Sequence, residues 1–257
     1  MNELFDINGR VMVLTGAAGL VGKNLVKELS ERGAKIIAVD VSEEVLAGLN
    51  DISGEIKTYV CNVSQSNEVG ELKKYVESEF GKVDVLINNH QYKPQGFLEA
   101  KAETFPEELW DSIINVNLKG TFLTCRDFGQ MMLKQGHGSI INFASTYGIV
   151  SSNPDLYEGN SMGNPIAYTA SKGGVVMLTK YLGVYWASKG VRVNAITPHG
   201  VWNNHEEGFN VRFSKMSPMN RMMNVDEVTG GVLFLASDAS SYMTGNNLIL
   251  DGGWSSW

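Results

Sequence analysis

Residues 11–22 (VMVLTGAAGLVG) decide the fold. The first four predict a buried strand, and the rest form a glycine-rich turn that opens a helix. We expect Gly16 to allow a tight bend, Gly19 to let the backbone approach a pyrophosphate, and Gly22 to let the helix pack on the strand. The free N–H groups of the helix would then face the phosphates. An ordinary strand-to-helix turn is the alternative, because the chain holds 28 glycines.

Short apolar runs alternate with longer amphipathic stretches along the rest of the chain. Leu25, Val26 and Leu29 recur at helical spacing, as do residues 69, 72 and 76, and Ser64 or Ser66 could cap the second of these helices. This alternation predicts one α/β domain over residues 1–257, a Rossmann fold with a doubly wound parallel seven-stranded sheet and helices on both faces. The expected strands are 11–14, 35–39, 56–60, 83–87, 139–143, 191–196 and 248–250.

Composition points to small-molecule chemistry. The formal charge of −7 at pH 7 argues against nucleic acid or an anionic membrane surface as a partner. Cys61 and Cys125 do not suggest a disulfide framework, and the four histidines show no zinc spacing, so we expect no metal. Residues 1–10 contain no long apolar run, and we expect a cytoplasmic protein without a signal peptide or membrane span.

Asp40 predicts the choice of coenzyme. It ends the second expected strand, 18 residues after Gly22, where a carboxylate can accept hydrogen bonds from the adenosine ribose and repel a 2′-phosphate. Neither Val41 and Ser42 nor the two alanines of the glycine turn supply a cation for that phosphate. The sequence therefore favours NAD(H) over NADP(H). The alternative is that Asp40 is a solvated turn or cap residue.

Two Tyr-x-x-x-Lys pairs follow, at Tyr168/Lys172 and at Tyr185/Lys189. Pro165 predicts a helix start, so Tyr168 would lie in the first turn, near the strand ends, and Tyr185 about 25 Å further along the axis. We therefore expect the first pair to be functional and Tyr185 to be structural or interfacial.

The first pair suits acid–base catalysis. A phenol with a pKa near 10 is a poor proton acceptor at neutral pH, and an ammonium one helical turn away, together with a positive nicotinamide ring, would lower that pKa. Ser145, just after the expected strand 139–143, can hydrogen-bond the reacting oxygen and orient it.

From Asn8 to Gly253 the chain resembles the short-chain dehydrogenase/reductase family. The family's Asn-Ser-Tyr-Lys tetrad matches Asn117, Ser145, Tyr168 and Lys172. The resemblance implies that Tyr168 is the acid/base, that Lys172 also holds the nicotinamide ribose, and that Asn117 supports a proton-relay water. It also implies a homo-oligomer, most commonly a tetramer.

Further motif matches extend the predicted coenzyme site. Asn88-Asn89 resembles the start of the family's Asn-Asn-Ala-Gly motif, and Asn194 with Pro198 its Asn-x-x-x-Pro-Gly segment. The departures are Leu20 in the glycine turn, Asn62 where Asp is common, and His90 and His199 within the two motifs. The expected coenzyme contacts are Gly16, Gly19, Leu20, Gly22, Asp40, Asn62, Val63, Asn89, Tyr168, Lys172, Pro198 and Val201.

A long interval between Ser145 and Tyr168 predicts an extended substrate loop at about 148–164. With the segment around Asn203 it offers many hydrogen-bonding groups and little continuous apolar lining, which favours polyols and sugars over acyl chains. The candidate substrate residues are His90, Tyr157, Glu158, His199 and Asn203. The loop as a plain surface insertion, and the two histidines as locally bonded groups, are the alternatives.

The chain ends in Trp254-Ser255-Ser256-Trp257, whose aromatic residues would anchor a subunit interface or stack on a sugar. This tail and the Tyr157-Glu158 loop resemble a bacterial subgroup of the family associated with surface-sugar and flagellin-glycan pathways, including the nonulosonic acid route.

These patterns together predict an NAD(H)-dependent oxidoreductase that acts on a secondary alcohol or ketone of a polar, sugar-like substrate. The alternatives are a nucleotide-sugar epimerase or dehydratase, a 3-oxoacyl thioester reductase and a non-catalytic NAD-binding sensor. The glycine spacing favours the epimerase, but only 85 residues follow Lys172, which leaves little room for a separate substrate lobe.

Overall fold

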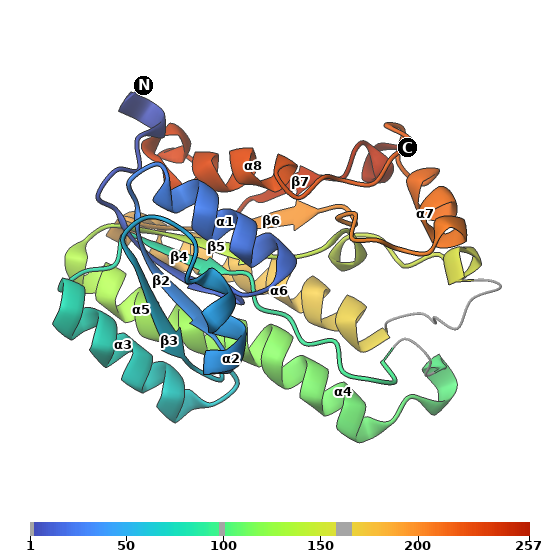
Figure 1. Cartoon of the computed structure of the whole chain (residues 1–257), viewed down its shortest axis with the longest axis horizontal. Coiled ribbons are helices and arrows are strands. Elements are labelled where there is room, and N and C mark those ends of the chain that lie inside the picture. The colour runs from blue at the N-terminus through green and yellow to red at the C-terminus, as the bar shows by residue number, and fades with distance from the viewer. Residues whose placement is uncertain (1–2, 98–100, 158–165) are drawn as a thin grey trace.

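The computed structural model describes residues 3–97, 101–157 and 166–257. Its centre is a seven-stranded parallel sheet in the order β3-β2-β1-β4-β5-β6-β7 (Figure 1). The strand order reverses between β1 and β4, which is the switch point of a doubly wound fold. The strands are β1 Val11–Thr15, β2 Lys35–Asp40, β3 Ile56–Val60, β4 Val85–Asn88, β5 Gly138–Phe143, β6 Val191–Pro198 and β7 Asn247–Leu250.

The predicted fold class is confirmed, and the strand bounds differ from expectation by at most two residues. Two-residue differences occur at β4, which begins at Val85 rather than Val83, and at β6, which ends at Pro198 rather than Ile196. At β4 the cause is the pairing with β1. Its pairing with β1 starts where Met12 meets Val85, while the preceding Asp84 accepts a hydrogen bond from the N–H of Val11 through its side chain.

Helices cover both faces of the sheet (Figure 1). Successive residues of β1 point to opposite faces, so Met12 packs with the core that contains α1 and α8, whereas Val13 packs with α3, α5 and α6. The helices are α1 Leu20–Ser30, α2 Glu43–Leu46, α3 Ser66–Phe80, α4 Glu107–Ile114, α5 Thr121–Gln135, α6 Ile166–Trp186, α7 Glu207–Ser214 and α8 Glu227–Ala236. Asn115–Gly120 form a π-helical turn between α4 and α5.

The predicted serine cap of α3 is wrong. Gln65 is the N-cap residue and makes no side-chain cap bond. The Ser64 hydroxyl instead donates to Oδ1 of Asn62, and the Ser66 hydroxyl accepts from Arg126. Asn62 thus organises the turn between β3 and α3.

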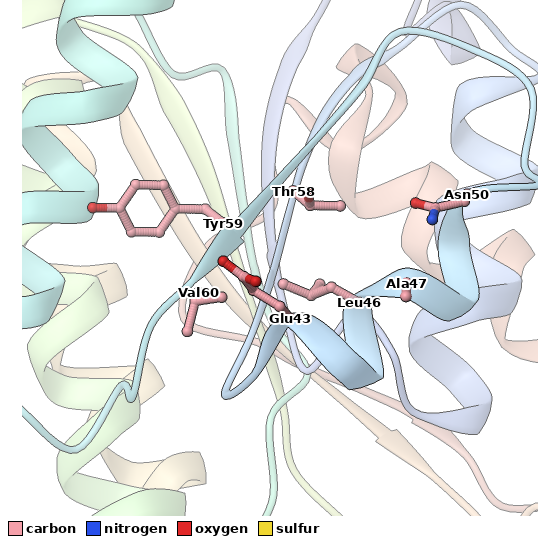
Figure 2. Close-up of a pocket in the computed structure, with 7 residues that line it drawn as sticks. All are labelled: Glu43, Leu46, Ala47, Asn50, Thr58, Tyr59 and Val60. Carbon is pink, nitrogen blue, oxygen red and sulfur yellow. The ribbon is translucent and has the colours of Figure 1, made fainter.

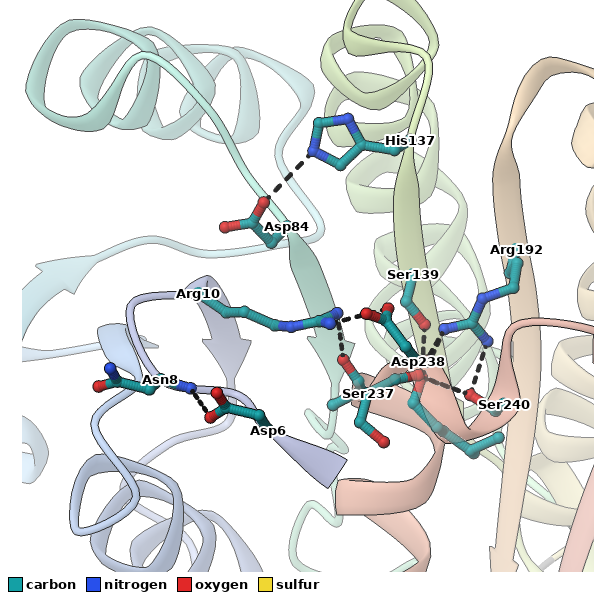
Figure 3. A network of polar contacts seen from close by, with 12 residues as sticks. Asp6, Asn8, Arg10, Asp84, His137, Ser139, Arg192, Ser237, Asp238 and Ser240 are labelled. Atoms are coloured by element: carbon teal, nitrogen blue, oxygen red, sulfur yellow. Dashed lines mark hydrogen bonds and ion pairs between the residues drawn. The ribbon is translucent and has the colours of Figure 1, made fainter. Parts of the chain in front are cut away.

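Paired charges close the amino end of the sheet (Figure 3). Asp84 accepts from the N–H of Val11 and lies 2.8 Å from Lys82 Nζ. Arg10 pairs with Asp238 at 2.8 Å, and the guanidinium of Arg192 donates to Ser240 and to backbone carbonyls after α8. Burial opposes the ionisation of Asp84, but hydrogen bonds from Lys82 and Val11 outweigh it and keep the pKa of the carboxyl below its usual value.

Both cysteines are free and buried on the face of the sheet that α3 and α5 cover. Burial raises the pKa of the Cys61 and Cys125 thiols to about 12. Among the described residues, no helix is long and apolar enough to cross a membrane, and no three His, Cys, Asp or Glu side chains are grouped so as to hold a metal ion.

Candidate active site

The glycine turn lies at the carboxyl end of β1, beside the switch point. Gly16 has φ +65°, a left-handed conformation that favours glycine. A Cβ on Gly22 would lie 2.1 Å from the carbonyl oxygen of Gly16, so the helix can approach the turn only without a side chain there. A Cβ on Gly19 would make only an ordinary contact of 3.5 Å with the same oxygen. Sterically, the protein itself requires glycine at positions 16 and 22 but not at 19.

Asp40 faces this turn from the end of β2. Its carboxylate oxygens accept from the N–H groups of Ala18 at 2.9 Å and Val41 at 2.8 Å. Each oxygen keeps a second lone pair. Asp40 therefore both supports the turn and can accept hydrogen bonds from ribose hydroxyls.

The rest of the turn fits a dinucleotide. Gly19 is the N-cap of α1 and brings no side chain to cap the helix, so the first N–H groups of α1 are free to bind an anion. Leu20 starts α1 and is exposed, and Asn89 donates to the carbonyl of Gly16 at 2.9 Å, which ties the end of β4 to the turn. Pyrophosphate binding suits this arrangement of small residues and unpaired donors.

Asn62 and Val63 lie beside the turn between β3 and α3. Oδ1 of Asn62 accepts from both the N–H and the hydroxyl of Ser64. Val63 is buried against Gly120, the last residue of the π-helical turn. Since both lone pairs of Asn62 Oδ1 are engaged, this oxygen is poorly placed to accept a further bond from an adenine amino group.

Tyr168, Ser145 and Lys172 converge at the end of β5. The Tyr168 and Ser145 hydroxyls are hydrogen-bonded. Lys172 is buried, its Nζ donates to the carbonyl of Phe143 at 2.7 Å, and it lies 5.7 Å from the centre of the Tyr168 ring. A phenol, a hydroxyl and an amine therefore meet where β5 ends, as the sequence predicts. Pro165, the expected helix start, lies outside the described residues.

In the protein without coenzyme, the pKa of Tyr168 is not lowered as the sequence predicts. Burial raises the pKa of Tyr168, and the hydrogen bond to Ser145 offsets only part of this rise. Burial, together with the charge of Lys93, lowers the pKa of Lys172 to about 7. The low-dielectric surroundings thus favour the neutral amine, which weakens the positive charge that was expected to lower the tyrosine pKa.

Asn117 lies in the π-helical turn and is fully buried. Its Oδ1 accepts from the N–H of Tyr92 at 2.7 Å, and its Nδ2 donates to the hydroxyl of Ser171 beside Lys172. Such turns are frequent at functional sites, because the extra residue redirects a side chain. Asn117 therefore joins α6 to the loop after β4.

His90 is held inside the protein. Its Nδ1 lies 2.7 Å from the Thr15 hydroxyl, and its Nε2 lies 3.3 Å from the Thr121 hydroxyl, which donates to the carbonyl of Asn117. Burial lowers the pKa of His90 to about 3, so the ring is neutral at physiological pH. Both nitrogens are engaged, and the geometry favours the local structural interpretation over contact with substrate.

His199 differs from His90 in its hydrogen bonding. It follows Pro198 at the end of β6 and is 5% exposed, and neither ring nitrogen has a hydrogen-bond partner among the described residues. The ring packs against Phe213 and Trp254, with centroid distances of 4.7 and 5.3 Å. Val201, two residues on, is half-buried and forms a single bridge to Met223. His199 thus leaves its polar atoms unpaired beside the predicted nicotinamide site.

A buried apolar cluster includes Tyr157 and underlies the segments that carry the predicted substrate rim. Three separate segments converge to form it, because each carries aromatic side chains that the sheet does not bury. Tyr157 is 9% exposed and its hydroxyl lies 2.8 Å from that of Tyr147. The buried members are Tyr147, Leu156, Tyr157, Phe209, Phe213, Met222 and Trp254. Glu158 and the rest of the predicted loop, residues 159–164, lie outside the described residues.

The terminal tryptophans have different environments. Trp254 is 6% exposed and packs edge-on against Tyr147 and Phe213 of its own chain. It therefore needs no partner subunit for burial, whereas Trp257 is exposed. Tyr185, the second tyrosine with a following lysine, is also exposed and stacks on Tyr181, far along α6.

Three rim residues complete the site, and one of them, Lys93, was missed by sequence reasoning. Asn203 and His205 follow β6, and both are exposed. Lys93, from the loop after β4, places its Nζ 5.7 Å from the Tyr168 ring centre. The sequence signal for Lys93 was its place three residues after His90, on a strand-end loop.

A separate hollow lies at the sheet edge, between α2 and β3 (Figure 2). None of the residues that line it belongs to the predicted tetrad. They are Glu43, Leu46, Ala47, Asn50, Thr58, Tyr59 and Val60.

Comparison with known proteins agrees with this geometry. Residues 16–255 match a family described as Enoyl-(Acyl carrier protein) reductase. D-threitol dehydrogenase of Mycolicibacterium smegmatis is 33% identical over 97% of this chain and 94% of its own length. The 3-oxoacyl-[acyl-carrier-protein] reductase FabG of Thermotoga maritima is 35% identical, over 96% and 98% respectively. The chain belongs to the short-chain dehydrogenase/reductase family, and it is an oxidoreductase that uses a nicotinamide coenzyme.

Solved structures share the whole fold. A gluconate 5-dehydrogenase from Burkholderia cenocepacia, in complex with NADP and tartrate, has a TM-score of 0.88 at 29% identity, over 99% of this chain and 98% of that one. A short-chain dehydrogenase from Leptospira borgpetersenii with bound NAD+ has a TM-score of 0.87 at 29% identity, over 99% and 96%. Both coenzymes thus occur among its structural relatives.

Proposed function

We propose that the protein is an NAD(H)-dependent dehydrogenase or ketoreductase that acts on a secondary alcohol or ketone of a polar, polyhydroxylated substrate. The observation that carries this proposal is the convergence of Tyr168, Ser145 and Lys172 at the end of β5. The catalytic tetrad is Asn117, Ser145, Tyr168 and Lys172.

The tetrad acts through proton transfer at one oxygen. When bound, the nicotinamide ring gives or accepts the hydride and, in its oxidised form, brings a positive charge. Tyr168 exchanges a proton with the substrate oxygen, and the Ser145 hydroxyl orients that oxygen. Because burial raises the pKa of Tyr168, the phenol is held protonated in the protein alone and is ready to act as the acid for ketone reduction.

Lys172 and Asn117 support this proton transfer. The amine is anchored by the Phe143 carbonyl and can bind ribose hydroxyls as well as supply positive charge near the phenol. With a pKa of about 7, Lys172 can also exchange a proton itself near neutral pH. Asn117 holds the turn that faces Lys172, and we assign it the support of a water in the relay.

The test compares the two tyrosines that precede a lysine by four residues. Tyr168→Phe is expected to lower kcat by about 10²- to 10⁴-fold, because it removes only the acid–base group. Tyr185→Phe removes the same atom from an exposed site of the same helix and should leave kcat unchanged. Activity is followed as NADH absorbance with a panel of polyols, aldonates, sugar phosphates and acyl thioesters. Equal turnover by wild type and Tyr168→Phe would reject the assignment.

NAD(H) is the proposed coenzyme because Asp40 supports the glycine turn and leaves acceptor sites toward the ribose. Replacing Asp40 by Ala together with Val41→Arg removes the repulsive charge and adds a cation. We expect the ratio of kcat/KM for NADP to that for NAD to rise by at least about tenfold. An unchanged ratio rejects the role of Asp40, and Val41→Arg alone is the control.

Relatives named for threitol, glycerol and gluconate support the polyhydroxylated substrate. The hypothesis of a surface-sugar pathway is supported by the Tyr157-Glu158 loop and the Trp tail alone, and the 148–164 segment is proposed as the substrate loop. A 3-oxoacyl thioester reductase is the second candidate, favoured by the apolar cluster of Tyr147, Phe209 and their neighbours and by the FabG relative. Turnover of acetoacetyl thioesters above that of every polyol would select it.

We also propose a homo-oligomer in the cytoplasm. Large apolar side chains of α6 are exposed, among them Met177, Tyr181, Val184 and Tyr185, which suits a subunit interface. Two unpaired thiols suit a reducing compartment. Light scattering of the purified chain tests the assembly.

A further inference from the structure

Two ammonium groups approach the ring of Tyr168. Lys172 Nζ and Lys93 Nζ each lie 5.7 Å from its centre. Lys172 is anchored by a carbonyl, but no carboxylate among residues 3–97, 101–157 and 166–257 lies within ion-pair distance of Lys93. An unpaired cation therefore stands beside the proposed acid–base group.

Lys93 is a solvent-exposed residue. Burial lowers the pKa of Lys93, which means that protein atoms surround its ammonium, while the residue as a whole stays exposed to solvent. Lys93 also lowers the pKa of Lys172, so the two charges repel each other. In a chain with a net charge of −7, this local excess of positive charge costs free energy that a bound anion would recover.

His205, which follows β6, supplies a hydrogen-bond donor within range of the Lys93 charge. His205 Nδ1 accepts from the backbone N–H of Asn203 at 3.2 Å, in a tight turn where Asn204 has φ 51°. The proton of the neutral ring is therefore on Nε2, which is left as a donor. Lys93 lies close enough for its charge to contribute to the lowered pKa of His205. Lys93, after β4, thus lies beside the Tyr168 ring, and the donor of His205, after β6, lies within range of the Lys93 charge.

We infer that Lys93, assisted by Nε2 of His205, binds an anionic group of the substrate, a carboxylate or a phosphate ester, within a few bonds of the reacting carbon. The inference rests on the proposed function for the position of that carbon beside Tyr168. It narrows the substrate from any polyhydroxylated compound to one that carries a negative charge near the reactive hydroxyl or ketone.

Three probes that share one carbon skeleton test the inference. D-glucitol, D-gluconate and D-glucitol 6-phosphate differ in bearing a hydroxymethyl, a carboxylate or a phosphate at a chain end. Dissociation constants are measured with the enzyme–NADH complex by coenzyme fluorescence, so that no turnover is needed. We expect at least one anionic probe to bind about tenfold to hundredfold more tightly than D-glucitol, as a charge-assisted hydrogen bond allows. Tighter binding of D-gluconate would indicate a carboxylate site, and tighter binding of D-glucitol 6-phosphate would indicate a phosphate site.

Variants assign the effect to Lys93. Lys93→Gln should remove the preference for the anionic probe and leave the D-glucitol constant unchanged, whereas Lys93→Arg should retain the preference. Lys101→Gln removes an exposed lysine further along the same segment and should change neither constant. A purely structural role of Lys93 would weaken all three probes equally.

The inference is overturned if neither anionic probe binds more tightly than D-glucitol, if Lys93→Gln keeps the preference, or if that variant instead weakens NADH binding. These outcomes are separate from those for the proposed function. If hydride transfer requires Tyr168 but binding shows no preference for an anionic probe, only the anion site is rejected. If binding depends on charge but turnover survives Tyr168→Phe, only the tetrad is rejected.

Discussion

At the amino end of the sheet, charged side chains such as Asp84 pair with opposite charges, whereas at the carboxyl end Lys93 and Lys172 have no carboxylate within ion-pair distance among the described residues. Asp84 engages Val11 and Lys82 at the first end. At the second end, Lys93 has no carboxylate partner among the described residues, His199 has no hydrogen bond, and Lys172 has only a carbonyl. One end thus stabilises the fold, and the other retains binding capacity at the expense of stability.

The largest expected effect comes from removing the buried amine. Lys172→Met should lower kcat by about 10²- to 10⁴-fold, because the phenol loses its neighbouring charge. It should also raise the free energy of unfolding at pH 7 by about 2 kcal/mol, because a buried charge is replaced by an apolar side chain.

The pH dependence of stability follows from the same group. The folded pKa of Lys172 is about 7, below the value of about 10.4 in an unfolded chain. At this site the unfolded chain binds more protons between these values, so Lys172 makes the stability of the wild type rise with pH above about pH 7. Above about pH 8.5 the thiols of Cys61 and Cys125 oppose this rise, because burial keeps their folded pKa values at about 12. Lys172→Met should flatten this rise in urea titrations. A variant that is less stable at every pH contradicts the comparison.

The next effect concerns the glycine turn. Gly22→Ala places a Cβ 2.1 Å from the Gly16 carbonyl, so the turn must shift. We expect the dissociation constant for NADH to rise by about tenfold or more, equivalent to at least about 1.4 kcal/mol. Gly70→Ala in α3, where nothing lies within 4 Å of the added atom, should instead stabilise the chain by about 0.5–1 kcal/mol and leave NADH binding unchanged. NADH fluorescence titration and thermal unfolding measure both.

At the amino end, Asp84→Ala should lower the stability by about 1–3 kcal/mol, because the buried N–H of Val11 loses its acceptor. The folded pKa of Asp84 lies below its unfolded value, so its contribution is present above about pH 4 and is lost as the pH falls through the folded pKa. Urea titrations at pH 7 and pH 3 measure this contribution, and kcat/KM should not change. Glu71→Ala breaks the exposed Lys74–Glu71 pair and should cost nothing measurable.

The smallest effect is a gain in stability at the carboxyl end. His199→Leu removes two unpaired buried nitrogens and should raise the melting temperature, by an amount equivalent to about 1 kcal/mol. His137→Leu is the matched control at the other end, where the imidazole pairs with Asp84, and should not stabilise. A lower melting temperature for His199→Leu would show that the ring has a partner.

The sequence predicted the parts of this molecule that depend on local pattern. Parallel strands buried on both faces appear as apolar runs, which is why the central strands such as Val11–Thr15 were placed well. The convergence of Tyr168 with Ser145 followed from the rule that functional groups gather at the carboxyl ends of strands.

What the sequence did not give depends on contacts between distant segments. Tyr147, Phe213 and Trp254 form one cluster only because three chain segments meet, and no spacing signals this. The approach of Lys93 to Tyr168 depends on the path of a loop, and the raised pKa of Tyr168 depends on burial. The expected serine cap of α3 failed because Asn62 already organises that turn.

The two buried cysteines can report on local opening of the helical layer that covers them. With thiol pKa values of about 12, only about one thiol in 10⁵ is ionised at pH 7, and both are enclosed in the same helical layer. Alkylation by a maleimide therefore requires that layer to open. Its rate, read by mass spectrometry, measures how often α3 and α5 detach from the sheet, independently of events at α1 and α8.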